Sequence, residues 1–474
     1  MQRHFRLAAV GAAVVILAGC ASVNIDQAVD DTNQSTRDFT QGRLELSRTE
    51  EQRQARLRLS GELLEKPLSM EDAVQLALAH SPAMQVLLAQ SWADMAAADQ
   101  VGRIANPVFT FERMRLGSEL ELGRLLSVGL LDILTLPYRQ GISRNQLAQA
   151  RVQLSANVVE QVGQVRQAWV RAVAARQLLK YAEQVNKTAQ AGAELAKRMQ
   201  QVGNFTKLQR ARQQVFYADS AAQLASARHA DTAAREELVR QLGLDDVRSG
   251  QLKLPDRLPD LPKEPRAAAA VSAATAQQRL DVQLARLQLD VAGRSQGLNL
   301  LNSLVDAEVG VRRDTVFENN GTGGRATRKG YELALRLPIF DAGGAQRASM
   351  NATSLAAANR YDSAMRSAGS HLRESYSAYR TAYDLARHYR DEIVPLRKTM
   401  AEENVLRYNG MLIGVFELLA DTRDQIASVM QAINAQQQFW LADAALSASV
   451  IGKPMAIGTT SVSTSPSSGT GAGH

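Results

Sequence analysis

Alternating hydrophobic and polar positions mark a strand in the second half of the chain. Residues 331–337 (YELALRL) place an apolar side chain at every second position, with polar or small residues between them. A period of two predicts a strand with one apolar and one polar face. Pro338 ends this strand because it has no N–H to donate, and an Ala-rich helical pattern begins directly after it, at Gly344.

The same succession of strand, Leu-Pro pair and long helix occurs roughly 200 residues earlier, within residues 124–140 (RLLSVGLLDILTLPYRQ). The Leu-Pro pair at 136–137 matches the pair at 337–338, and each long helix pattern later breaks at a glycine, Gly203 or Gly410. We therefore predict two copies of one unit, with additional segments at both ends of the chain.

A second alternating run accompanies each of these strands. In the first unit Phe109 and Phe111 alternate with polar residues, before the strand within 120–130; in the second, residues 305–311 alternate and a polar loop at 313–329 leads back to Tyr331. Each run approaches the roughly 9–11 residues of a tilted transmembrane strand. Two soluble hairpins packed on helices are the alternative, but Glu, Asp, Arg and Gly on the second face favour a wet lumen.

Four strands cannot close a barrel, and lipid does not tolerate an open strand edge. If the strands cross a membrane, closure must therefore be shared between chains, as eight strands in a dimer or twelve in a trimer.

Very long helices follow each pair of strands. Apolar residues recur in steps of three and four from Leu147 towards Val202, and again from Tyr361 to Ala386. A helix of roughly 60 residues would extend about 90 Å, and such sustained periodicity indicates coiled-coil-like packing. The pattern returns after each glycine, so each unit combines a strand hairpin with a helical hairpin. The predicted fold class is mainly α with a small transmembrane β part and an internal repeat.

The chain divides into six predicted segments. Ser69 is an N-cap candidate and Pro82 starts a new helical segment, whereas residues 24–66 are at best weakly helical. The boundaries are a signal peptide at 1–19, an acylated segment at 20–66, the first repeat at 67–250, a Pro-rich linker at 251–266, the second repeat at 267–454 and a disordered tail at 455–474.

The N-terminus resembles a bacterial lipoprotein signal. Arg3 and Arg6 precede a short apolar run that ends in Leu-Ala-Gly-Cys20, and Cys20 is the only cysteine. The resemblance implies lipidation of Cys20, and Ala21 in place of Asp points to the outer membrane. An ordinary signal peptide that contains a cysteine is the alternative. A single cysteine excludes an internal disulfide.

Composition argues against an enzyme or a nucleic-acid-binding protein. The net charge is +7, but both signs are mixed along the helical patterns, as on a solvated helix surface. The six histidines form no metal-ligand spacing with each other or with Cys20, and no nucleophile or phosphate-loop motif occurs. We expect no cofactor and no catalytic residue.

The chain resembles the TolC family of outer-membrane efflux channels, in its acylated branch, over roughly residues 66–454. The matching segments are LSMEDAVQLALAHSP at 68–82, VGNFTKLQRARQQ at 202–214, LRLPIFDAGG at 335–344 and YNGMLIGVFELLADTR at 408–423. Two positions depart from the family pattern. Arg279-Leu280-Asp281 stands where Arg-Pro-Asp is frequent, and residues 136–139 lack the Asp-Gly-Gly of the second copy.

This resemblance implies a homotrimer whose strands form one twelve-stranded barrel above a periplasmic helical tunnel. It also implies a periplasmic adaptor and an inner-membrane pump of the RND type as partners. The expected role is a passive efflux channel for small molecules or metal ions, and segment 203–218 is similar to heavy-metal branches. A type I protein-export channel, or a non-conducting coiled-coil lipoprotein, is the alternative.

The resemblance places the free periplasmic end of the channel at the helical tips. Gly203, Asn204, Gly410 and Met411 are the expected adaptor contacts. An acidic aperture ring is expected after the second tip, and its candidates are Glu417, Asp421 and Asp424, spaced four and three residues apart. Exposed coiled-coil charges are the alternative. Lys207, Arg210 and Arg212 at the first tip are possible partners of these acids.

Overall fold

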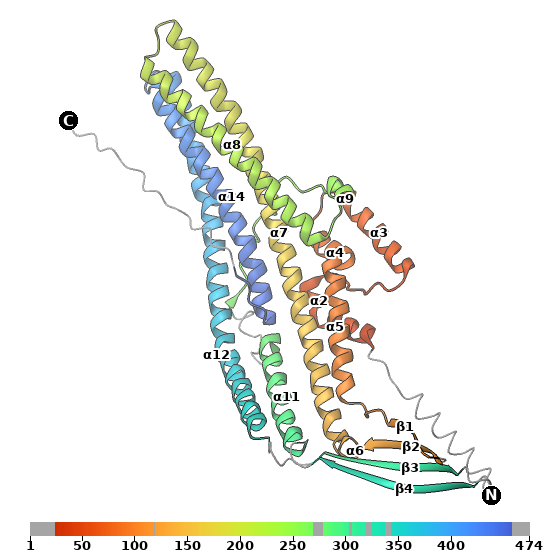
Figure 1. The fold of residues 1–474 in the computed structure, drawn as a ribbon. Helices are drawn as coiled ribbons and strands as arrows, with labels where there is room; N and C mark the ends of the chain where they lie inside the picture. The colour runs from red at the N-terminus through yellow and green to blue at the C-terminus, as the bar shows by residue number, and fades with distance from the viewer. Residues whose placement is uncertain are drawn as a thin grey trace.

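Long helices define the axis of the molecule, and a small sheet projects from one end of them (Figure 1). The computed structural model describes residues 24–117, 119–268, 278–302, 306–318, 324–336 and 343–456. Cys20, the predicted signal peptide, the strand exit at 337–342 and nearly all of the predicted tail lie outside the described residues. The mainly helical fold with one small sheet agrees with the predicted class.

The first half of the chain begins its main body with two helices and a strand hairpin. The Ser69 hydroxyl caps the first of these helices by accepting from the Asp72 N–H at 3.0 Å. Pro82 starts the second helix, where its missing N–H costs nothing. The elements are α4 (Met70–His80), α5 (Pro82–Val101), β1 (Val108–Leu116), β2 (Glu119–Gly129) and α6 (Leu130–Leu134).

Helix α7 (Leu136–Gln201) runs for 66 residues without interruption, about 100 Å at 1.5 Å per residue. It turns at its far end into α8 (Lys207–Leu242), which packs back along it, and it also contacts α5, α11 and α14. Trp169 in the middle of α7 is 1% exposed. Its indole N–H donates to the Leu68 carbonyl at 2.9 Å, which ties α7 to the segment before α4.

The second half repeats the order of helix, strand hairpin and helical hairpin. Its elements are α11 (Leu280–Asn302), β3 (Asp306–Glu318), β4 (Arg325–Arg336), α12 (Gly344–His388), the π-helical turn η2 (Tyr389–Ile393), α13 (Val394–Asn409) and α14 (Val415–Ile451). The π-helical turn directly precedes Pro395, whose missing N–H interrupts the regular hydrogen-bond ladder of the long helix. Helix α14 returns along α12 and α13.

All four strands form one antiparallel sheet in the order β1-β2-β3-β4. The central pair, β2 and β3, joins the two halves of the chain, with Leu126 opposite Val311. The predicted loop at 313–329 was wrong in part, because strand pairing continues through Phe317 on β3 and Arg325 on β4. These strand ends carry polar residues on both faces, so the alternation of apolar and polar positions that predicts a strand is absent there.

A segment without helix or strand, residues 252–267, connects α9 (Asp246–Gln251) to the second half. Side chains of both halves hold it: the Leu258 N–H donates to Gln177 of α7 at 3.2 Å, and Trp440 donates its indole N–H to the Pro259 carbonyl at 3.0 Å. Arg266 lies 2.9 Å from the Asp443 carboxylate on α14. Burial raises the pKa of Asp443, and the charges of Arg266 and Arg166 oppose that rise.

The expectation of a weakly helical segment before Pro67 was wrong. Two helices form there, α2 (Ile25–Thr40) and α3 (Glu50–Leu64). Helix α2 buries Thr32 and Thr36 together with its apolar residues, and the Thr32 hydroxyl lies 3.3 Å from that of Ser155 on α7. Helix α2 is strongly amphipathic but polar in overall composition, and α3 carries no apolar stripe, so composition concealed both helices.

The hydrogen bond of Trp169 gives a test of how firmly α7 is held. Trp169→Phe should lower the free energy of unfolding by about 1–3 kcal/mol, because it leaves the buried Leu68 carbonyl without its donor. Urea unfolding followed by circular dichroism measures this change. The matched control is Trp92→Phe, because Trp92 is 38% exposed, and it should change stability by no more than about 0.5 kcal/mol. Equal effects would show that the buried hydrogen bond contributes nothing.

Candidate functional site: a two-faced sheet and two helical tips

One face of the sheet, the polar face, carries a connected set of ion pairs around Arg312 of β3. The guanidinium lies 2.9 Å from Glu112 on β1 and 3.7 Å from Glu332 on β4. It also lies 3.1 Å from Asp314 on its own strand. A single arginine therefore links the two outer strands of the sheet across its centre.

Gly123 of β2 makes this link possible. It lies between Glu112 and Asp314 in the strand register. A Cβ at this position would lie 3.3 Å from both the Glu112 Cβ and an Asp314 carboxylate oxygen. Because glycine has no side chain, Arg312 reaches over β2 to Glu112 without obstruction.

The opposite face, the apolar face, exposes large hydrophobic side chains. Among the residues that the structure describes, the helix that packs most against the strands is the short α6, at the ends of β2 and β3. A contiguous exposed apolar patch is typical of a membrane or protein interaction surface. Its members that are more than half exposed are Phe109, Phe111, Leu126, Val311, Tyr331, Leu333 and Leu335.

The sheet has two free edges. Strand β1 pairs only with β2, and β4 pairs only with β3, in the part of the chain that the structure describes. Each edge therefore presents a row of backbone N–H and C=O groups without a strand partner. Because the four strands alternate in direction, the β4 edge of one copy can pair antiparallel with the β1 edge of another.

The α7–α8 hairpin forms the first tip, at the end of the molecule opposite the sheet (Figure 1). Gly203 adopts φ +84°, the left-handed conformation that glycine reaches without strain. Its N–H donates to the Gln200 carbonyl at 3.0 Å, and the Asn204 N–H donates to the Met199 carbonyl at 2.9 Å. These two bonds are the Schellman arrangement that ends a helix.

The second tip, between α13 and α14, ends its helix with the same two bonds. The Met411 N–H donates to the Tyr408 carbonyl at 2.9 Å, and the Leu412 N–H donates to the Arg407 carbonyl at 2.8 Å. Met411, not Gly410, holds the positive φ here, at +58°. The structural counterpart of Gly203 is therefore Met411, a residue for which this conformation is strained.

Both tips expose large apolar side chains to solvent. Met411 is 93% exposed and Leu412 is 73% exposed at the second tip, while Val202 and Leu208 are 70% and 62% exposed at the first. Asn204 lies within the first turn, so the four expected contact residues all lie at the two tips. Such a surface can bury apolar area against another protein.

The three candidate ring residues differ in their surroundings. Asp424 pairs with Arg397 on α13 at 3.1 Å, and the Asp421 carboxylate accepts from the Asn404 side-chain amide, also on α13. Glu417 is exposed in the first turn of α14, and no side-chain partner for it occurs among the described residues. Two of the three acids thus hold α13 and α14 together.

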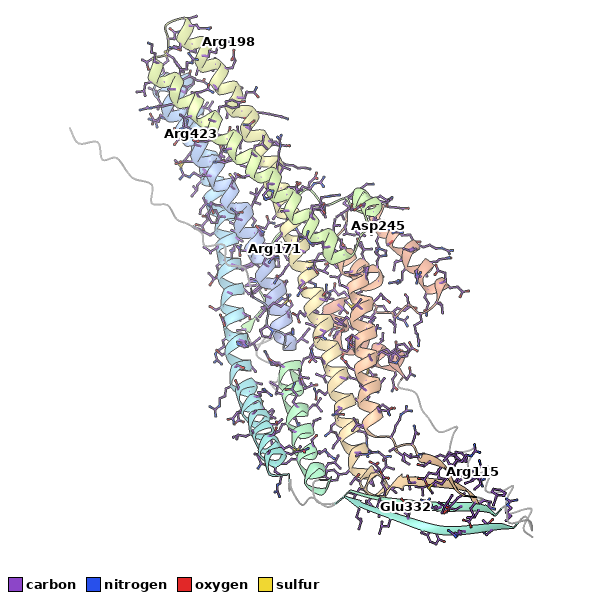
Figure 2. The ribbon with its side chains drawn as sticks, in the orientation of Figure 1. Arg115, Arg171, Arg198, Asp245, Glu332 and Arg423 are labelled. Atoms are coloured by element: carbon purple, nitrogen blue, oxygen red, sulfur yellow. The ribbon has the colours of Figure 1, made fainter. Side chains whose placement is uncertain are left out.

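Sequence reasoning missed Arg423, which links the two hairpins. Its guanidinium stacks 4.4 Å from the centroid of the Phe216 ring on α8 and donates to the Arg212 carbonyl at 3.3 Å. Arg210 instead donates to Gln200 within the first hairpin. Figure 2 shows Arg423 close to the distal end of the bundle, with Arg198 nearer the first tip. In the sequence Arg423 stands between Asp421 and Asp424, and nothing in that pattern predicts a contact with α8.

None of the helices in the described part of the chain has the length and apolarity that a membrane-crossing helix needs. The same residues contain no group of three or more His, Cys, Asp or Glu side chains arranged to bind a metal ion.

Solved structures of outer-membrane proteins share this fold. A membrane protein from Pseudomonas aeruginosa aligns with a TM-score of 0.67 at 17% identity, over 80% of this chain and 93% of its own. The outer membrane protein VceC from Vibrio cholerae aligns at 0.66 and 15% identity, over 81% and 96%. CusC, for which transmembrane channel formation is described, aligns at 0.65 and 14% identity, over 81% and 92%.

Neither a protein-family profile nor a curated protein sequence matches the chain. At these identities the likeness shows the fold alone, and it confirms the predicted combination of long helices with one small antiparallel sheet.

The two tips predict opposite responses to substitution. Gly203→Ala should destabilise the first tip by about 1 kcal/mol, because alanine is strained at a positive φ, and Met411→Gly should stabilise the second tip by a similar amount. Hydrogen exchange of the Asn204 and Leu412 amides measures both changes. Gly414→Ala is the control, because Gly414 has an ordinary φ of −82° and a Cβ there meets nothing within 4 Å. Faster exchange at Leu412 in Met411→Gly would contradict the assignment.

Proposed function

We propose that this protein is the outer-membrane channel of a tripartite efflux system. It is a passive conduit without enzymatic activity, and it receives solutes from an inner-membrane pump and a periplasmic adaptor. The observation that carries the proposal is the two-faced sheet. An exposed apolar face suits lipid, and a polar face built around Arg312 suits a water-filled lumen.

Closure of the barrel requires other copies of the chain. One chain supplies four strands with two free edges, and lipid offers no partner for unpaired backbone groups. We propose a homotrimer in which each β4 edge pairs with the β1 edge of the next chain, which gives a twelve-stranded barrel. The cyclic arrangement uses every edge once and leaves none exposed.

The length of the helices supports a periplasmic tunnel below this barrel. Helix α7 alone spans about 100 Å, far more than a bilayer thickness of about 30 Å. The two internal repeats would then each contribute one strand hairpin and one helical hairpin to the wall. The sequence at Cys20 supports an acyl anchor in outer-membrane lipid, so we place the protein in the outer membrane of a Gram-negative bacterium.

The tips are the proposed docking site for the adaptor. Their exposed apolar side chains, with Gly203, Asn204, Gly410 and Met411 in the turns, lie at the end that faces the inner membrane in this orientation. A pump of the RND type would supply the energy, because the channel has no energy source of its own. Glu417 is the proposed aperture residue, with Asp421 and Asp424 behind it on the same helix.

In a tripartite system the pump mainly selects the solute that the channel carries. We propose small molecules or metal ions as cargo, and the likeness of residues 203–218 to heavy-metal branches supports ions. A type I protein-export channel would share the barrel and tunnel. A non-conducting coiled-coil spacer would not need a polar sheet face with the Arg312 ion pairs.

Single-channel recording tests the proposal directly. The purified full-length protein should have the mass of a trimer by native mass spectrometry and should give discrete openings in a planar bilayer. The N-terminal peptide of the same preparation should begin at an acylated Cys20. A protein that stays monomeric in a membrane and never conducts would contradict the channel and favour the spacer.

The acidic residues after the second tip test the aperture. Glu417→Ala combined with Asp421→Ala should lower the cation-to-anion permeability ratio about twofold or more, because rings of negative charge favour cations. The charge-matched control is Glu194→Ala combined with Glu236→Ala, two exposed acids on α7 and α8. If both double variants conduct like the unchanged protein, these acids do not line the pore.

A further inference from the structure

The half of the apolar face nearest the strand turns carries six basic side chains, which we call the basic belt. Figure 2 shows Arg115 towards the end of the sheet that points away from the helices. All belong to the same face by strand register, and five are exposed while Arg124 is half-buried. The members of the belt are Arg113 and Arg115 of β1, Arg124 of β2, Arg313 of β3, and Arg325 and Lys329 of β4.

The acidic residues of the strands lie on the polar face, whereas the charged residues of the apolar face are all basic. Acidic residues of the strands occupy register positions on the polar face, where Arg312 pairs with several of them. None of the six belt residues has an ion pair with an acidic side chain among the described residues, and the Arg325 guanidinium lies 5.8 Å from the centroid of the Phe317 ring. The acids with described side chains on the polar face are Glu112, Glu119, Glu121, Glu308, Asp314 and Glu332.

Three belt residues lie in one row directly across the sheet. Arg124 is opposite Arg313, and Arg313 is opposite Lys329. Like charges at directly opposite positions destabilise a sheet, and charges on a lipid-facing surface are costly near the bilayer midplane. Both costs disappear if the row lies at the bilayer surface and an anion binds between the cations.

We propose that the basic belt binds the phosphate groups of a phosphorylated glycolipid in the outer leaflet, the chemistry of lipid A. This rests on the proposed function, which places the apolar face in lipid and the strand turns outside the cell. Arginine presents planar, paired donors that match phosphate oxygens, and long basic side chains reach the surface while their stems stay on apolar neighbours. The apolar rows beside the belt, with Phe109, Leu126 and Val311, would then contact the acyl chains.

Free inorganic phosphate does not fit this placement, because the belt is continuous with exposed apolar side chains and has no enclosing walls. Cation-bridged lipid does not fit either, because a bridging divalent ion needs acidic ligands, and the acids of the strands belong to the polar face. The belt therefore makes direct contacts that should persist in a chelator.

The test is a titration of the full-length trimer in detergent with fluorescent bis-phosphorylated lipid A in the presence of EDTA. Arg124→Gln with Arg313→Gln and Lys329→Gln should weaken binding about thirtyfold, and Lys329→Gln alone about threefold, because each surface cation contributes to binding of anionic lipid. The charge-matched control is Arg328→Gln with Lys187→Gln and Lys197→Gln. Arg328 neighbours Lys329 but belongs to the polar face, and the two lysines are exposed on α7.

Equal binding by the triple variant and the unchanged trimer would overturn the belt, as would equal binding of dephosphorylated lipid A or equal weakening in the control. Conductance in phosphatidylcholine bilayers, recorded on the same preparations, separates the two proposals. If the trimers conduct but the triple variant binds lipid A as well as the unchanged protein, the proposed lipid site is wrong and the proposed channel function stands. A trimer that neither inserts into the bilayer nor conducts would contradict both the lipid site and the channel function.

Discussion

Unpaired backbone groups at a strand edge are the constraint on which the rest of this structure depends. The chain builds a four-stranded sheet and leaves β1 and β4 each with a free edge. Water can satisfy such an edge, but a hydrocarbon layer cannot. A sheet with an exposed apolar face and two open edges therefore needs further strands to pair with its edges in lipid. Because its strands alternate in direction, identical copies of the chain can supply them. The proposed trimer is a consequence of this backbone requirement.

The two faces of the sheet distribute charge in a way that fits such an assembly. On the polar face Arg312 neutralises acids from three strands, and Gly123 keeps the path between them open. Because acids outnumber basic residues on this face, a ring of such clusters would give the lumen a net negative charge. The apolar face has no acids to balance its belt, so its neutralisation must come from outside the protein. The same arginine chemistry thus serves an internal network on one face and an external ligand on the other.

The helical half of the molecule is organised around α7. It is the longest element, it contacts helices from both halves of the chain, and its Trp169 is bound to the segment that precedes α4. At its distal end the two hairpins close with the same pair of hydrogen bonds, although one uses Gly203 and the other uses Met411. Arg423 joins these hairpins through Phe216 and the Arg212 carbonyl. The tips are therefore coupled to each other before any partner binds.

Periodicity in the sequence was enough to locate the four strands and the long helices. A period of two located the strands, steps of three and four located the long helices, and Ser69 and Pro82 located helix starts, because these signals depend on local geometry and solvent exposure. The prediction failed where a helix is polar in overall composition, as in α2 and α3, and where both faces of a strand carry charge, as beyond Arg313.

Only the tertiary structure decided which side chains meet. It paired Asp424 with Arg397 and Asp421 with Asn404, and it assigned the strained tip position to Met411 in place of Gly410. It also showed that the acids of all four strands share one face, because this depends on how β2 pairs with β3, two strands far apart in the chain. Alternation within one strand fixes which residues share a face, but only strand pairing brings Arg124, Arg313 and Lys329 into one row.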